Sequence, residues 1–197
     1  MTPQRLQQQI DFILEIDRLK TIGRRTYLTD TSRFENSAEH SWHIAVMAMV
    51  LAEHANEDGL DLFRVIRMML LHDLVEIDAG DTFAYDDQAR QDKAEREEAA
   101  ADRIFRLLPA DQAEKFRALW EEFEARQTAE ARFAAALDRL QPLLHNLFTK
   151  GKSWQEHGVT KDQVTGLNRH MAEGAADLWD YAAAAIDRAV ARGHLPE

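Results

Sequence analysis

A short apolar segment near residue 75 carries three ionisable side chains with the potential for chemistry. His72, Asp73 and Glu76 interrupt the run 70–77, whose other residues are the aliphatic types of a buried core. A buried charge is costly unless it is paired with an opposite charge or bound to a metal. The segment therefore indicates a site at which something compensates these groups.

The spacing of these residues favours a metal site. On a helix, positions i, i+1 and i+4 project into one sector of about 100°, so we expect His72, Asp73 and Glu76 to point the same way. Imidazole and carboxylate are the natural ligands of Mn, Fe, Co, Zn or Mg. Two adjacent ligands do not complete such a site. The best further candidates are His40, at the start of an apolar helix, and Asp138, beside the apolar stripe of a late helix.

Each of these residues also has an ordinary alternative. A histidine near a helix start is often a capping or surface residue, and Asp138 could pair with a nearby arginine. His43 lies close to His40, and His145 follows Asp138 by seven residues on a similar helix face. We expect His43 to be a packing or surface residue, whereas His145 could support the site from behind.

Helical periodicity runs through nearly the whole chain, and no segment shows strand-like alternation or an internal repeat. We expect helices at about 3–20, 37–55, 60–77 and 91–108, then one whose apolar stripe is Phe116, Leu119, Trp120 and Phe123. A sixth helix follows Thr128 and carries a stripe from Phe133 to Leu147, and a last one, with a bend at Gly174, covers about 160–191. Asn36 or Ser37 is a candidate N-cap for the second of these and Thr128 for the sixth. The segments 21–37, 82–91 and 151–158 are expected to be loops.

Composition limits the classes of protein to consider. With 197 residues, 45% of them hydrophobic, the chain suits one globular domain. A net charge of −11 argues against binding to nucleic acid polymers or anionic membranes through a basic surface. The chain has no cysteine, so thiolate–metal sites are excluded and any metal needs histidine and carboxylate ligands. With no apolar run long enough for a membrane span and a polar N-terminus, we expect a cytoplasmic protein.

The order of the candidate ligands resembles the signature of the HD-domain metal-dependent phosphohydrolases, which is a histidine, a His-Asp pair and a later aspartate. His40, His72-Asp73 and Asp138 match it. The wider match is to the 5′-deoxynucleotidase branch and covers roughly residues 15–145. It is carried by Leu19-Lys20 to Arg24, Glu39-His40-Ser41, His72-Asp73 to Glu76, Gly80-Asp81, Leu119 to Arg126, Glu130 to Phe133 and Leu137 to Leu140.

This resemblance implies a fold and a cofactor. The fold would be all-α, a single HD-domain bundle of about six to eight helices over residues 1–197. Its metal-site core would span about 20–145, with a helical extension at about 160–192. The cofactor would be a divalent metal cation, whether Mn, Co, Mg, Fe, Ni or Zn. Its implied ligands are His40, His72, Asp73 and Asp138.

The resemblance also implies an activity, the hydrolysis of (deoxy)nucleoside 5′-monophosphates to nucleoside and phosphate by a homodimer. Glu76 would accept a proton from water or orient it, and Asp81 would shape the same pocket; in some relatives their equivalents are associated with a second cation. Arg24 matches the phosphate-binding arginine of the family. Arg25 follows it where one relative has an aromatic residue that is thought to select the deoxy sugar, and Tyr27 is a candidate substitute. Base and sugar preference stay open.

Two other classes of function compete with this reading. One is an HD-fold hydrolase of a different substrate, such as a nucleoside triphosphate or a signalling nucleotide, or an oxygen-using di-iron relative. The other is a non-catalytic protein that binds a nucleotide or a metal. The complete set of four ligands, together with Glu76 and Asp81, favours the nucleotidase.

Overall fold

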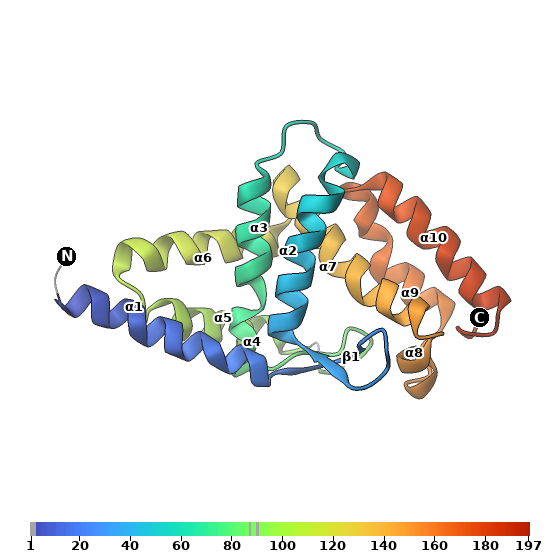
Figure 1. The fold of residues 1–197 in the computed structure, drawn as a ribbon, viewed down its shortest axis with the longest axis horizontal. Coiled ribbons are helices and arrows are strands. Elements are labelled where there is room, and N and C mark those ends of the chain that lie inside the picture. Colours follow the sequence, from blue (N-terminus) through green and yellow to red (C-terminus); the bar gives the residue numbers. More distant parts are fainter. Residues whose placement is uncertain (1–2, 87, 90) are drawn as a thin grey trace.

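Helices dominate the computed structural model, which describes residues 3–86, 88–89 and 91–197 (Figure 1). The helices are α1 (Pro3–Ile16), α2 (Ser37–Leu51), α3 (Leu62–Leu71), α4 (Glu76–Ala79), α5 (Lys93–Phe105), α6 (Ala110–Ala125), α7 (Ala129–Phe148), α8 (Lys152–Glu156), α9 (Lys161–Asn168) and α10 (Ala176–Ala191). Two short strands, β1 (Gly23–Tyr27) and β2 (Phe34–Asn36), pair antiparallel. The expected all-α class is confirmed.

The described residues contain more helices than the six to eight expected, because two expected helices are interrupted and α8 forms in a segment expected to be a loop. The segment 60–77 is not one helix: α3 ends at Leu71, a 3-10 turn covers His72–Val75, and α4 follows. The segment 160–191 is divided into α9, a 3-10 turn and α10. A Cβ atom on Gly174 would lie 2.2 Å from the Arg132 carbonyl oxygen, so this glycine lets the chain between the helices approach α7 closely.

Two segments that were expected to be loops contain secondary structure. Residues 21–37 include the β1–β2 hairpin, and residues 151–158 include the short helix α8. The hairpin strands are too short to show the alternation of apolar and polar residues that identifies a strand in a sequence. Within the third expected loop, at 82–91, residues 87 and 90 lie outside the described part of the chain.

The N-caps follow the predictions. The Asn36 side chain accepts from the Glu39 backbone N–H at the start of α2, and the Glu39 carboxylate accepts from the Asn36 backbone N–H, which completes a capping box. Thr128 caps α7 by accepting from the Ala131 backbone N–H. These caps fix where α2 and α7 begin, and therefore which of their side chains face the interior.

Helix α7 lies at the centre of the molecule. It contacts α2, α3 and α6 on one side and α8, α9 and α10 on the other, and Figure 1 shows it behind the α2–α3 pair. Its residues Phe133 and Leu137 are fully buried in the larger of two apolar cores. A smaller core joins α1, α5 and the 3-10 turn after α3. Among the described residues, no helix has the length and apolar character to cross a lipid bilayer.

Candidate active site

Four side chains from three distant segments meet in one buried cluster. His40 comes from the first turns of α2, His72 and Asp73 come from the 3-10 turn after α3, and Asp138 comes from the middle of α7. Asp138 Oδ1 lies 2.9 Å from His40 Nε2 and 3.5 Å from His72 Nε2. His72 Nε2 lies 3.0 Å from Asp73 Oδ1. The fold therefore brings together the four residues that the family resemblance implied as metal ligands.

The orientation of the two histidines fits a cation. His72 Nδ1 lies 3.0 Å from the Met69 carbonyl oxygen, so this nitrogen donates a proton to the carbonyl and Nε2 faces the cluster. His72 Nε2 is buried and lies within 3.5 Å of the Asp73 and Asp138 carboxylates. Ligand atoms of His40, His72 and Asp73 lie within 4.8 Å of one another. Nitrogen and carboxylate donors of this kind suit a first-row divalent metal.

The pKa values of the two histidines also indicate a cation site. Burial lowers the pKa of His40 to about 4, with the Arg24 charge adding to that effect. Burial also lowers the pKa of His72, but the Asp73 and Asp138 carboxylates outweigh it and raise this pKa to about 9. The Asp73 and Asp138 carboxylates thus stabilise a positive charge in the space between them. A bound cation would supply that charge in place of the proton.

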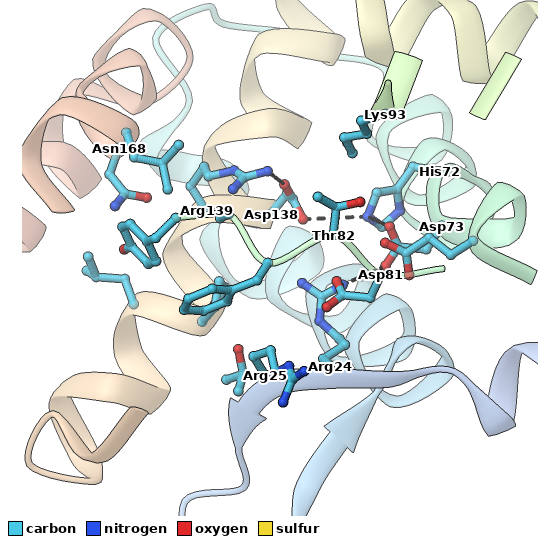
Figure 2. A pocket seen from close by; sticks show the side chains of 18 of the residues that line it. Arg24, Arg25, His72, Asp73, Asp81, Thr82, Lys93, Asp138, Arg139 and Asn168 are labelled. Atoms are coloured by element: carbon cyan, nitrogen blue, oxygen red, sulfur yellow. Dashed lines mark hydrogen bonds and ion pairs between the residues drawn. The ribbon is translucent and has the colours of Figure 1, made fainter. Parts of the chain in front are cut away.

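A guanidinium group and two further carboxylates border the cluster, and Figure 2 shows two of these groups, Arg24 and Asp81. Arg24, on β1, places Nη1 3.0 Å from Asp73 Oδ2 and 3.6 Å from Asp81 Oδ1. Gly80 has a φ of 73°, and this turn returns Asp81 to the cavity after α4. Glu76 is buried, and one of its oxygens, Oε2, accepts from Ser37 Oγ at 2.6 Å. Burial, then the Asp73 charge, raise the pKa of Glu76 well above its usual value.

The cluster opens into space large enough for more than a phosphate group. The cavity beside it measures about 110 Å³. A neighbouring cavity of about 520 Å³ shares wall residues with it, including Tyr85 and Arg139. Arg139 Nη2 lies 3.1 Å from Asp138 Oδ2, and its buried Nε has no hydrogen-bond partner within the described part of the chain. Ser153 and Asn168, from α8 and α9, also line the first cavity, so the C-terminal helices complete the pocket.

The remaining two residues expected to bind substrate lie in different places. Arg25 lines the cavity, and its backbone carbonyl accepts from Ser153 Oγ. Tyr27, by contrast, lines neither of the two cavities that the described residues form. Its hydroxyl lies 3.1 Å from a Glu156 carboxylate oxygen, and Lys152 Nζ lies 3.9 Å from its ring centroid. The hairpin thus brings Arg24 and Arg25 to the pocket and points Tyr27 towards α8.

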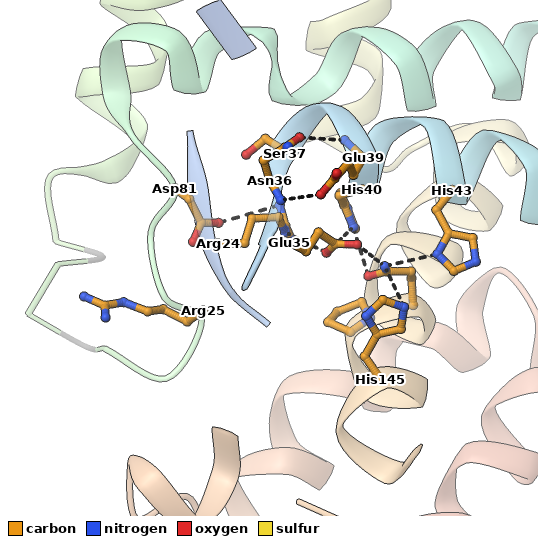
Figure 3. Close-up of polar contacts among 12 residues, drawn as sticks. Arg24, Arg25, Glu35, Asn36, Ser37, Glu39, His40, His43, Asp81 and His145 are labelled. Atoms are coloured by element: carbon orange, nitrogen blue, oxygen red, sulfur yellow. Dashed lines mark hydrogen bonds and ion pairs between the residues drawn. The ribbon is translucent and has the colours of Figure 1, made fainter. Parts of the chain in front are cut away.

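A buried polar network supports His40 from behind (Figure 3). Gln141, one turn after Asp138 on α7, places Oε1 3.0 Å from His40 Nδ1, so the ring donates to the amide oxygen and keeps Nε2 free for the cluster. The Gln141 amide nitrogen donates to Glu35 Oε1 and lies 3.2 Å from His145 Nε2 and 3.3 Å from His43 Nδ1. Glu35, His43 and His145 therefore surround an amide nitrogen.

Replacing Gln141 with leucine is expected to weaken binding of the divalent metal by roughly 10–100-fold, because His40 loses the group that holds its tautomer and ring orientation. Calorimetric titration of the metal-free protein with Mn²⁺ measures this directly, and a thermal melt checks folding. Gln127→Leu, at an exposed position before α7, is the matched control. Equal metal affinity in both variants would show that Gln141 does not position His40 for metal binding.

Several residues of the site were missed from the sequence. The sequence could have indicated Arg139 and Gln141, because they follow Asp138 on the same helix by one and three residues. It could not have indicated Glu35, which is one acidic residue in a segment without periodicity. Burial, opposed by Arg24 and by the Gln141 hydrogen bond, raises the pKa of Glu35 to about 7.

Comparison with known proteins adds independent findings. A sequence profile described as "HD domain" matches residues 16–179. The human protein named 5′-deoxynucleotidase HDDC2 is 34% identical over 136 residues, which cover 68% of this chain and 65% of the human protein. The bovine protein of the same name is 34% identical over 137 residues, covering 68% of this chain and 64% of that protein. The aligned part thus spans less than two thirds of these relatives' own length.

A solved structure is similar over nearly the whole chain. It is the crystal structure of a predicted metal-dependent phosphohydrolase from Magnetospirillum magnetotacticum. The two chains are 57% identical with a TM-score of 0.94, and the match covers 98% of this chain and 97% of the other. The similarity therefore includes the C-terminal helices, in which the sequence showed little motif.

Proposed function

This chain belongs to the HD-domain family, and from that premise we propose that it is a divalent-metal-dependent phosphohydrolase acting on deoxynucleoside 5′-monophosphates. The observation that carries the proposal is the convergence of His40, His72, Asp73 and Asp138 on one buried point beside Arg24. The names of the human and bovine relatives support the substrate class, and that of the Magnetospirillum protein supports the metal dependence. The products would be a deoxynucleoside and inorganic phosphate.

The proposed mechanism assigns a task to each group. A divalent cation held by the four ligands would supply Lewis acidity to the phosphate and to water. Arg24 presents a buried guanidinium to the phosphate oxygens, and such charge-assisted hydrogen bonds are short and strong. Glu76 Oε2 already accepts from Ser37. Its other oxygen, Oε1, takes one proton of the attacking water as the water oxygen bonds to phosphorus and the bond from phosphorus to the 5′ oxygen breaks; the same proton then passes from Glu76 to the 5′ oxygen, which leaves as the hydroxyl group of the deoxynucleoside.

The two adjoining cavities suggest where the substrate lies. A space of about 110 Å³ beside the ligands accommodates the phosphate group. The nucleoside then extends into the adjoining space of about 520 Å³, past Tyr85 and Leu167. Arg139 lies at the junction and lines both cavities. In this arrangement Arg24 and Arg139 approach the phosphate from two sides, which offsets the acidic character of the protein.

A phosphate-release screen tests the proposal. Purified protein is incubated with Mn²⁺, Co²⁺ or Mg²⁺ and with nucleoside mono-, di- and triphosphates in deoxy and ribo forms. We expect phosphate to be released from deoxynucleoside 5′-monophosphates, and we expect this release to require added metal. Faster release from triphosphates would favour the alternative substrate class, and no release from any nucleotide would overturn the proposal.

Replacing Arg24 with alanine is expected to raise KM for a deoxynucleoside 5′-monophosphate by roughly 10–100-fold, the effect of losing hydrogen bonds to a charged group. Metal affinity should change less, because Arg24 contacts Asp73 but is not itself a ligand. Steady-state kinetics at saturating metal separates the two effects. The exposed Arg106, which pairs with Asp102, provides the control as Arg106→Ala. An unchanged KM in Arg24→Ala would exclude it from phosphate binding.

We further propose that the protein is a cytoplasmic homodimer that buries an apolar face of α2 and α3. Trp42, Val50 and Phe63 are 64%, 66% and 68% exposed. Exposed apolar patches of this kind often mark protein interfaces. Light scattering of the native protein is expected to give the mass of two chains, and Trp42→Glu that of one. A monomeric native protein would contradict this assembly.

A further inference from the structure

A second groove lies apart from the metal cluster, between α7 and α10. It measures about 420 Å³, and its described wall residues include none that line the two cavities of the candidate active site. His43 and His145 form part of its wall, and their contacts with Gln141 separate it from His40. The groove is therefore a different site and not an extension of the first.

The groove is cationic in a protein whose net charge is −11. Arg188, in the last turns of α10, and Arg192, just after it, both line the groove and are exposed. Neither makes an ion pair with any other described residue, and none of the described wall residues is acidic. By contrast, the neighbouring Asp187 is paired with Lys161, the first residue of α9. Two unpaired guanidinium groups on one wall are suited to an anion such as a phosphate or sulfonate.

The same groove has an aromatic side. Phe148, the last residue of α7, is 74% exposed, and Tyr181 on α10 is 55% exposed. Both line the groove together with Leu144 and Leu147. An aromatic ring placed against these side chains would bury apolar surface that is now in contact with water. A small ligand that contacts both the arginines and the aromatic rings must therefore combine a flat aromatic ring with a negative charge.

We propose that this groove binds a small aromatic anion, with its ring against Phe148 and Tyr181 and its anionic group against Arg188 and Arg192. The ligand class includes nucleoside monophosphates and aromatic sulfonates. Charge complementarity favours this occupant over a neutral apolar molecule, and the limited volume favours it over a protein segment. The inference stands on the groove alone and does not depend on the proposed function.

The test uses trinitrophenyl-AMP, a fluorescent aromatic anion, with metal-free protein in EDTA so that no turnover occurs. One class of binding site is expected at the groove, and the proposed function adds a second class at the candidate active site. The double variant Arg188→Ala/Arg192→Ala should weaken one class by about 10-fold or more, as expected for the loss of hydrogen bonds to a charged group. Arg24→Ala should weaken only the other class. The double variant should also keep the metal content of the native protein.

The controls separate the contributions of ring and charge. Arg169→Ala removes an exposed arginine outside the groove and should leave both classes intact. Adenosine and inorganic phosphate, which have only one of the two features, should compete poorly for the groove class. The proposal is overturned if the double variant binds the probe like the native protein, if Arg169→Ala weakens binding equally, or if the double variant changes the mass in solution, which would identify the groove as a contact between copies.

Discussion

Replacing Asp73 with alanine is expected to abolish metal binding and to lower the rate of phosphate release by roughly 10³-fold or more, since a catalytic cation supplies several kcal/mol of transition-state stabilisation. The substitution removes one ligand of four. It also deprives His72 and Arg24 of their contacts with this carboxylate. Elemental analysis of the purified variant, with a phosphate-release assay at saturating metal, measures both effects.

Two controls make this experiment decisive. Asp177→Ala removes an aspartate whose side chain is 81% exposed, and it should retain metal content and rate. Asp73→Asn keeps the volume of the side chain and distinguishes loss of a ligand from loss of fold. If Asp73→Ala holds metal and turns over like the native protein, the metal site has been assigned to the wrong residues.

Replacing Glu76 with glutamine is expected to lower kcat by roughly 10²–10⁴-fold, the usual contribution of a positioned proton acceptor, while the metal remains bound. The amide oxygen can still accept from Ser37 Oγ, so the local geometry is preserved. The pKa of Glu76 is raised by burial and by the Asp73 charge. Because the base must be deprotonated, the native rate should increase as pH rises through that pKa, and the variant should lack this increase.

Ser37→Ala provides the matched comparison. The Ser37 hydrogen bond opposes the rise in the pKa of Glu76 because it stabilises the charged carboxylate. Its loss should raise that pKa further and move the increase in rate to higher pH, with the maximal rate largely retained. If Glu76→Gln loses the metal, Glu76 is a ligand and not the base. A pH–rate profile that is identical in native protein and Ser37→Ala would also exclude Glu76 as the group that titrates.

The two hydrolase hypotheses differ in how much room the substrate needs. A monophosphate places one phosphate between Arg24 and Arg139 and leaves the larger cavity to the nucleoside. A triphosphate would need further cations along its length. Lys93, which is paired with Glu97 at 3.1 Å, and Arg126 line both cavities, and Arg25 lines the first. Cationic side chains are thus present for either substrate, and the screen described above decides between them.

The sequence by itself was sufficient for the fold class and for the residues with unusual chemistry. Helical periodicity is a local property, and so are the caps at Asn36 and Thr128, because each depends on residues within a few positions. The ionisable groups of the segment 70–77 stood out because charges rarely occur in an apolar run without compensation. The resemblance then indicated which distant residues, His40 and Asp138, belong with them.

Only the tertiary structure decided how these groups are held and what surrounds them. The break at Leu71 and the 3-10 turn that presents His72 and Asp73 depend on packing against α5, not on local propensity. Gln141 acquires a role only because α2 places His40 beside it. The C-terminal helices carry little recognisable motif, yet Ser153 and Asn168 line the first cavity, and Arg188 and Arg192 line the groove between α7 and α10. Contacts between residues a hundred positions apart are set by the packing of whole helices, and no local pattern encodes them.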